Sequence, residues 1–191
     1  MYLDVNLKEV CDIDLDVIDN ILNNIEENDW YVDDYRKHAN NMSETASIPI
    51  FHSEECGTNP KSLWTIERRP LFNKYYPLIE PILNQLKTYY DYNYHASFIS
   101  KVNPYGTIGI HQDFGEFLER CHRIHIPLKT NENVFYYIDG EEYVWMKGKC
   151  YEFNNMLPHG VFNRSNEDRI HLVLNLYKLK DFELNFVKEN I

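Results

Sequence analysis

The stretch ASFISKVNPYGTIGIHQDFGEF (96–117) combines two strand-like segments, a turn and a polar motif. The segments 94–102 and 107–111 are rich in apolar and β-branched residues, and NPYG between them is typical of a turn. Further short segments of the same kind follow at 122–128, 133–138, 142–145, 149–153, 159–162 and 169–177. Many short strands without intervening helices predict a mainly β fold, such as a sandwich, jelly roll or barrel.

The N-terminal part of the chain has a different pattern. Apolar residues recur at helical spacing within 14–29, which predicts an amphipathic helix with Asp14 as its N-cap. A second helix is predicted over 77–90, where Pro81 is tolerable only in the first turn. The stretch between them has a weak pattern, with one predicted strand at 47–51. We therefore predict one domain over 1–191, divided into a helical and loop support (1–92), a jelly-roll core (93–178) and a C-terminal tail (179–191).

Composition and charge exclude several classes of protein. The formal net charge is −11, and a chain this acidic is repelled by phosphate backbones, so no nucleic-acid partner is expected. No apolar run reaches the length of a membrane span, and the N-terminus does not resemble a signal or transit peptide. The four cysteines form no CxxC pair, so we expect free thiols and a cytoplasmic location: Cys11, Cys56, Cys121 and Cys150.

The motif HQD (111–113) suggests a metal site. Residues i and i+2 of a strand point to the same face, so His111 and Asp113 can point at one place. His159 begins a later predicted strand, which can return beside the first in a small barrel. Two histidines and one carboxylate on one face form the triad typical of non-haem Fe(II) oxygenases. On these residues alone, a surface HxD and a turn histidine are equally good interpretations.

Arg169 begins the apolar segment 169–177 and follows His159 closely. One hairpin away from a metal at His159, its side chain can point into the same cavity and hold a carboxylate through two hydrogen bonds. An arginine in an apolar strand is costly unless it is paired, and a dicarboxylate cosubstrate would explain it. A surface arginine at the start of a strand is the alternative.

Six motifs, taken together and in order, resemble a known family. They are HQD (111–113), RIHIPLKTN (123–131), W-x-x-G (145–148), FNN (153–155), HGVFN (159–163) and DRIHL (168–172). Their order is similar to that of the aspartyl/asparaginyl β-hydroxylase family of Fe(II)- and 2-oxoglutarate-dependent dioxygenases, which includes bacterial proline hydroxylases. The resemblance runs from about Ser97 to Tyr177. It implies a double-stranded β-helix of cupin type that uses Fe(II), 2-oxoglutarate and O₂.

The resemblance also assigns roles to individual residues. His111, Asp113 and His159 would hold iron, and Arg169 would bind the distal carboxylate of 2-oxoglutarate. Ser100 matches a serine that supports this carboxylate. The animal aspartyl hydroxylase of the family has glycine at the position of Asp113. The chain is therefore nearer the bacterial-type members, and the epidermal-growth-factor-domain substrate is not readily transferred to it.

Arg123 and His125 match an R-x-H pair that lines the cosubstrate and substrate pocket in the family. Independently of the resemblance, the two residues share one strand face, while Ile124 and Ile126 share the other. A cationic face backed by an apolar one suits an anion pocket. A core histidine is the alternative interpretation of His125.

Several other side chains are expected to have structural roles. His38, His52 and His95 are predicted at the surface or in loops, and Arg69 in a solvated loop. His122 should point away from His125. Trp145 should pack in the core, and His171 could face the barrel interior.

The predicted activity is hydroxylation of an amino-acid residue, Asp-, Asn- or Pro-like, in a protein, in a peptide or as the free amino acid. Arg123 favours a carboxylate-bearing substrate. Two alternatives stay open: a dioxygenase of the same family that acts on another small metabolite, and a non-catalytic jelly-roll protein that binds a metal. The second is disfavoured because the triad, Ser100 and Arg169 are all present.

Overall fold

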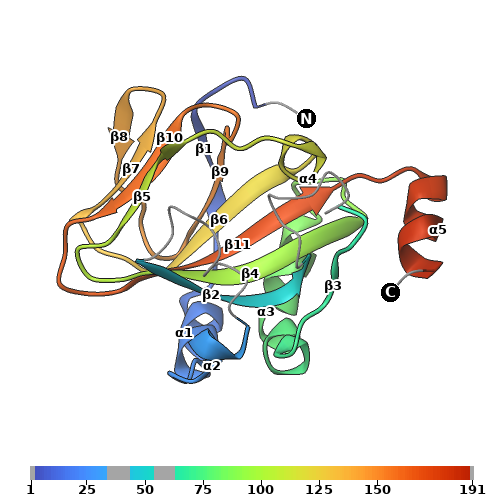
Figure 1. Ribbon diagram of the computed structural model, residues 1–191, viewed down its shortest axis with the longest axis horizontal. Helices are drawn as coiled ribbons and strands as arrows, with labels where there is room; N and C mark the ends of the chain where they lie inside the picture. The colour runs from blue at the N-terminus through green and yellow to red at the C-terminus, as the bar shows by residue number, and fades with distance from the viewer. Residues whose placement is uncertain (1–2, 34–43, 54–62, 190–191) are drawn as a thin grey trace.

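The computed structural model describes residues 3–33, 44–53 and 63–189 (Figure 1). Its elements are β1 (Leu7–Asp12), α1 (Leu15–Asn23), α2 (Asp29–Val32), β2 (Thr45–His52), β3 (Glu67–Arg68), α3 (Phe72–Leu86), β4 (Tyr94–Val102), β5 (Thr107–His111), α4 (Glu116–Glu119), β6 (His122–Lys129), β7 (Val134–Ile138), β8 (Glu141–Tyr143), β9 (Lys149–Phe153), β10 (His159–Asn163), β11 (Arg169–Tyr177) and α5 (Asp181–Glu189).

The strands form two antiparallel sheets. The larger sheet has seven strands in the order β1-β9-β6-β11-β4-β2-β3, and the smaller sheet has four in the order β5-β10-β7-β8. From β4 to β11 the chain passes back and forth between the two sheets. This alternation is the double-stranded β-helix, so the predicted mainly β, jelly-roll class is confirmed.

The strands of the core lie close to their predicted positions. The bounds of β4, β5, β9 and β11 are those predicted from alternation and turn residues, and the other core strands differ by one or two residues at an end. The largest difference is at β8, which ends at Tyr143. Trp145 leaves the edge of the smaller sheet and is only 1% exposed, because its ring is buried between the sheets.

The helices differ more from the prediction. The first predicted helix (14–29) is shorter in the structure, because α1 ends at Asn23 and the separate short helix α2 begins only at Asp29. Asp14 caps α1 as expected by accepting the N–H of Asp16 at 2.9 Å. The helix α3 begins at Phe72, so Pro77 and Pro81 both lie inside it, and the prediction that Pro81 lies in the first turn is wrong. Both prolines are exposed, and the carbonyl groups that lose a partner therefore face water.

The N-terminal part contributes strands as well as helices. The unpredicted strand β1 pairs with β9 at one edge of the larger sheet, and β2 pairs with β4 near the other edge. As an edge strand that is largely half-exposed or exposed, β1 has mixed polar and apolar residues and no clear alternation.

The two faces of the larger sheet have different partners. On the outer face, Ile124 and Ile126 of β6 pack into a core with Ile18 of α1 and Ile79 of α3, and Figure 1 shows these helices beneath the sheet. On the inner face, the side chains meet the smaller sheet. Alternation therefore turns Arg123 and His125 inward, as predicted.

Candidate active site

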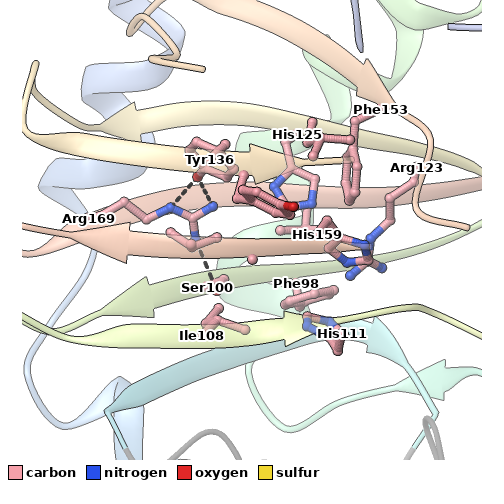
Figure 2. A pocket seen from close by; sticks show the side chains of 15 residues that line it. Phe98, Ser100, Ile108, His111, Arg123, His125, Tyr136, Phe153, His159 and Arg169 are labelled. Atoms are coloured by element: carbon pink, nitrogen blue, oxygen red, sulfur yellow. Dashed lines mark hydrogen bonds between the residues drawn. The ribbon is translucent and has the colours of Figure 1, made fainter. Parts of the chain in front are cut away.

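The polar side chains of the inner faces meet in one cavity between the sheets (Figure 2). The larger sheet contributes the polar lining residues Ser100 of β4, Arg123 and His125 of β6, and Arg169 of β11. The smaller sheet contributes His111 of β5, Tyr136 and Tyr137 of β7, and His159 of β10. Six of the seven residues predicted for the site, all of them in strands, therefore line this cavity. Asp113, the seventh predicted residue, stands beside the two histidines.

The predicted metal ligands converge. One donor atom each from His111, Asp113 and His159 lies within 4.8 Å of the others. The Nε2 atoms of His111 and His159 are 3.7 Å and 3.9 Å from the same carboxylate oxygen, Oδ1 of Asp113. Burial lowers the pKa of His159, although the nearby Asp113 carboxylate opposes this shift, so its neutral form is favoured.

Backbone carbonyl groups orient both histidines. The Nδ1 of His111 lies 2.8 Å from the carbonyl oxygen of Gly109, and the Nδ1 of His159 lies 2.8 Å from that of Leu157. A carbonyl oxygen only accepts, so each Nδ1 carries a proton, and each Nε2 faces Asp113. Two imidazole nitrogens and a carboxylate fit the donor preferences of Fe(II).

A bulge in β5 brings His111 to this position. His111 pairs with His159 but Ile108 pairs with Val161, so β5 has one extra residue at this point. Such a bulge redirects the following side chain. A Cβ on Gly160 would lie 2.9 Å from the carbonyl oxygen of Ile108, so only glycine fits opposite the bulge.

Asp113 lies beyond the end of β5, so strand alternation alone does not place it. Its N–H donates to the carbonyl oxygen of Asn155 at 3.1 Å, and its Oδ2 accepts from Nδ2 of Asn155 at 3.1 Å. Asn155 belongs to the FNN motif but received no role from the sequence. Its contact depends on the packing of two loops, which no local pattern reveals.

Arg169 is buried at the other end of the cavity, with 1% of its surface exposed (Figure 2). Its Nη1 lies 3.4 Å from Oγ of Ser100, and its Nε donates to the hydroxyl of Tyr136 at 2.5 Å. Tyr136 was not predicted as a site residue. Its ring stacks on Trp145 with centroids 3.6 Å apart, and its hydroxyl also contacts His171, which faces the interior as expected. The sequence did offer one indication, because Val134, Tyr136 and Ile138 alternate along β7 and so share its buried face.

Arg123 lies near the triad end of the cavity (Figure 2). Its Nη1 donates to Oδ1 of Asn175 at 2.7 Å, and its guanidinium lies 5.6 Å from the ring centre of Phe98. Its Nε is buried without a hydrogen-bond partner. Within the described part of the chain, no carboxylate forms an ion pair with it. His125 is 8% exposed and contacts the rings of Trp145 and Phe153 edge-on.

The structure corrects some predictions outside the cavity. His52 is 1% exposed and lies in β2, so it is neither a surface nor a loop residue. His95 lies in β4 and is half-buried, and burial lowers its pKa to about 4, so it is not a loop residue. Arg69 is not solvated, because it forms an ion pair with Asp33 at 2.7 Å. His122 does point away from His125, as predicted, and its Nδ1 lies 2.6 Å from Glu152. His38 lies outside the described residues.

Two histidines and a carboxylate that converge inside a jelly roll are typical of non-haem Fe(II) oxygenases. The family model of the aspartyl/asparaginyl β-hydroxylases matches residues 32–178, and the chain belongs to this family. The chain is therefore a 2-oxoglutarate-dependent dioxygenase, with Fe(II), 2-oxoglutarate and O₂ as its cofactor and cosubstrates.

Two solved structures share the fold across nearly the whole chain. A Pseudomonas putida prolyl-4-hydroxylase has a TM-score of 0.56 and 12% identity, with 93% of this chain and 95% of that chain covered. A viral collagen prolyl hydroxylase from Paramecium bursaria Chlorella virus-1, solved as a 2-oxoglutarate complex, has a TM-score of 0.53 and 13% identity, with 92% and 98% covered. No curated protein matches the sequence significantly. Among the described helices, none is both long and apolar enough to cross a membrane.

Proposed function

We propose that this dioxygenase hydroxylates an amino-acid residue in a protein, in a peptide or as the free amino acid. His111, Asp113 and His159 would hold Fe(II), and Arg169 with Ser100 would bind the distal carboxylate of 2-oxoglutarate. The observation that carries the proposal is the convergence of the three donor groups, with both Nε2 atoms directed at one carboxylate oxygen.

The layout of the cavity supports this division of roles. The triad and Arg169 lie at opposite ends, so a dicarboxylate extended between them can meet the metal with one end and the guanidinium with the other (Figure 2). When bound, iron and 2-oxoglutarate supply the activation of O₂ for insertion of an oxygen atom into a C–H bond. The protein's part is to anchor both ends of the cosubstrate and to surround it with apolar walls that exclude water.

Arg123 supports a finer proposal, that the substrate bears a carboxylate. Its guanidinium lies beside the triad, has no acidic partner within the described part of the chain and keeps a buried Nε without an acceptor. Arg123 is half-buried, and a partly buried cation without an anion is unfavourable, which a substrate carboxylate would resolve. The alternative partner is the C1 carboxylate of 2-oxoglutarate, which would also lie near the metal.

A mass-spectrometric screen tests the proposed substrate class. The protein with Fe(II) and 2-oxoglutarate is incubated with free amino acids and with peptides that contain Asp, Asn or Pro. A product that has gained one oxygen atom, absent with a His159→Ala variant, supports the proposal. Oxygenation confined to metabolites that are not amino acids would favour the alternative of another small-molecule substrate.

A further inference from the structure

The side chain of Asn155 is hydrogen-bonded to the carboxylate of Asp113. Its Nδ2 donates to Oδ2 of Asp113 at 3.1 Å and to the carbonyl oxygen of Leu118 at 3.0 Å. Both residues are buried, Asn155 with 5% and Asp113 with 8% of their surface exposed. Because both partners only accept hydrogen bonds, the amide nitrogen must face them, and both of its hydrogens are used.

Because of this contact, the two carboxylate oxygens of Asp113 have different partners. Oδ2 is occupied by the amide of Asn155, whereas Oδ1 faces the Nε2 atoms of His111 and His159. The hydrogen bond from the Asp113 N–H to the Asn155 carbonyl oxygen holds the two residues in register. Rotation of the carboxylate would break the bond to Asn155, so the side chain is fixed with one oxygen toward the metal position.

We infer that Asn155 is a positioning residue, which makes Asp113 a one-oxygen ligand of the metal. This inference rests on the proposed iron site. A carboxylate that offers only Oδ1 takes one coordination position and leaves the others for the cosubstrate and O₂. Without Asn155, Asp113 is free to rotate or to offer both oxygens. Partners of this kind typically contribute about 10–100-fold to metal affinity.

The chain offers a matched control at the preceding position. Asn154 has the same side chain, but its Nδ2 donates to the carbonyl oxygen of Leu3 at 2.9 Å and its Oδ1 accepts the N–H of Met156 at 3.2 Å. Neither of these side-chain hydrogen bonds involves Asp113. Replacing Asn154 therefore perturbs the same loop without touching the carboxylate.

The test is a titration of the metal-free protein with Co(II), followed by calorimetry and by visible absorption, which reports the coordination geometry of bound Co(II). The variants are Asn155→Ala, Asn155→Leu, Asn154→Ala and Asp113→Ala. Leucine keeps the shape of asparagine and lacks both N–H donors, so it retains packing and removes only the hydrogen bonds. We expect both Asn155 variants to bind Co(II) roughly 10–100-fold more weakly with an altered spectrum, and Asn154→Ala to match the wild type.

Wild-type affinity and an unchanged spectrum in Asn155→Leu would overturn the inference. If Asn155→Ala loses its circular dichroism spectrum, the leucine variant decides. Recovery of wild-type binding by leucine after loss in alanine would show a packing role and also overturn it. A wild-type affinity in Asp113→Ala would instead refute the proposed iron site, so the two failures are distinguishable.

Discussion

His111 and His159 face each other as register partners on β5 and β10, with ring centroids 4.3 Å apart. Their separation depends on the bulge of β5, which packs directly on Gly160. The geometry of the proposed metal site is therefore linked to the backbone of two strands as well as to the ligands themselves.

Gly160→Ala tests this link. The added Cβ would lie 2.9 Å from the carbonyl oxygen of Ile108 and 3.3 Å from Cα of Ile110, so the strands must separate. We expect a loss of about 1–3 kcal/mol of stability in urea unfolding, together with weaker Co(II) binding. Gly109→Ala is the matched control on the same bulge, because nothing lies within 4 Å of its added Cβ. Equal behaviour of the two variants would contradict the account.

Arg169→Ala tests the proposed anchor of 2-oxoglutarate. Loss of a buried, charge-assisted contact costs on the order of 2–4 kcal/mol, which corresponds to a roughly 30-fold or greater loss of cosubstrate affinity. Calorimetry with Mn(II) in place of iron measures this affinity directly. Arg164→Ala is the control, because Arg164 is exposed and pairs with Glu142 on the surface. Unchanged affinity in folded Arg169→Ala would show that the distal carboxylate binds elsewhere.

Arg123→Gln separates the substrate from the cosubstrate. If Arg123 binds a substrate carboxylate, coupled oxidation of substrate falls by about tenfold or more, while substrate-free decomposition of 2-oxoglutarate continues. The two rates are measured as hydroxylated product and as succinate. A parallel fall of both rates would assign Arg123 to the C1 carboxylate or to the fold, and the case for an anionic substrate would disappear.

The buried carboxylate of Glu152, which does not line the cavity, should make the stability of the protein depend on pH. Burial raises the pKa of Glu152, but hydrogen bonds from His122 and Tyr90 and the charge of His122 outweigh burial, so its pKa is lowered. A lowered pKa contributes stability that is present above the unfolded value of about 4.3 and is lost as pH falls through the folded pKa.

Urea unfolding of Glu152→Gln tests this dependence. At pH 7 the variant should be less stable than the wild type by roughly 1–3 kcal/mol, and this difference should shrink as pH falls below about 4. Glu132→Gln, at an exposed position, should show no such difference. A difference between Glu152→Gln and the wild type that is constant with pH would exclude this role of the carboxylate.

Much of the fold was predictable because its signals are local. The strands β4, β5, β9 and β11 follow from alternation and from the turn residues between them. The start of α3 was not predictable, because Pro77 and Pro81 are expected to break a helix. Both can lie inside α3 because they are on its exposed face, which the sequence alone does not reveal. The edge strand β1 was also missed, because it buries neither face fully and so shows no clear alternation.

In the candidate site too, features that depend on local spacing were predictable and long-range contacts were not. The inward direction of Arg123 and His125 follows from a spacing of two residues on one strand, which the sequence shows directly. The contacts of Asn155 with Asp113 and of Tyr136 with Arg169 join residues more than thirty positions apart, at 42 and 33 positions respectively. They arise from loop packing and from the register between two sheets, neither of which a local pattern contains.

The most direct test of the account is an anaerobic titration of the metal-free chain with Fe(II), comparing the wild type with His159→Ala and with His95→Gln as a control outside the cavity. The account predicts one Fe(II) per wild-type chain, unchanged binding in His95→Gln, and binding weakened by about 100-fold or more in a folded His159→Ala variant. Binding of Fe(II) to His159→Ala with wild-type affinity and stoichiometry would contradict it.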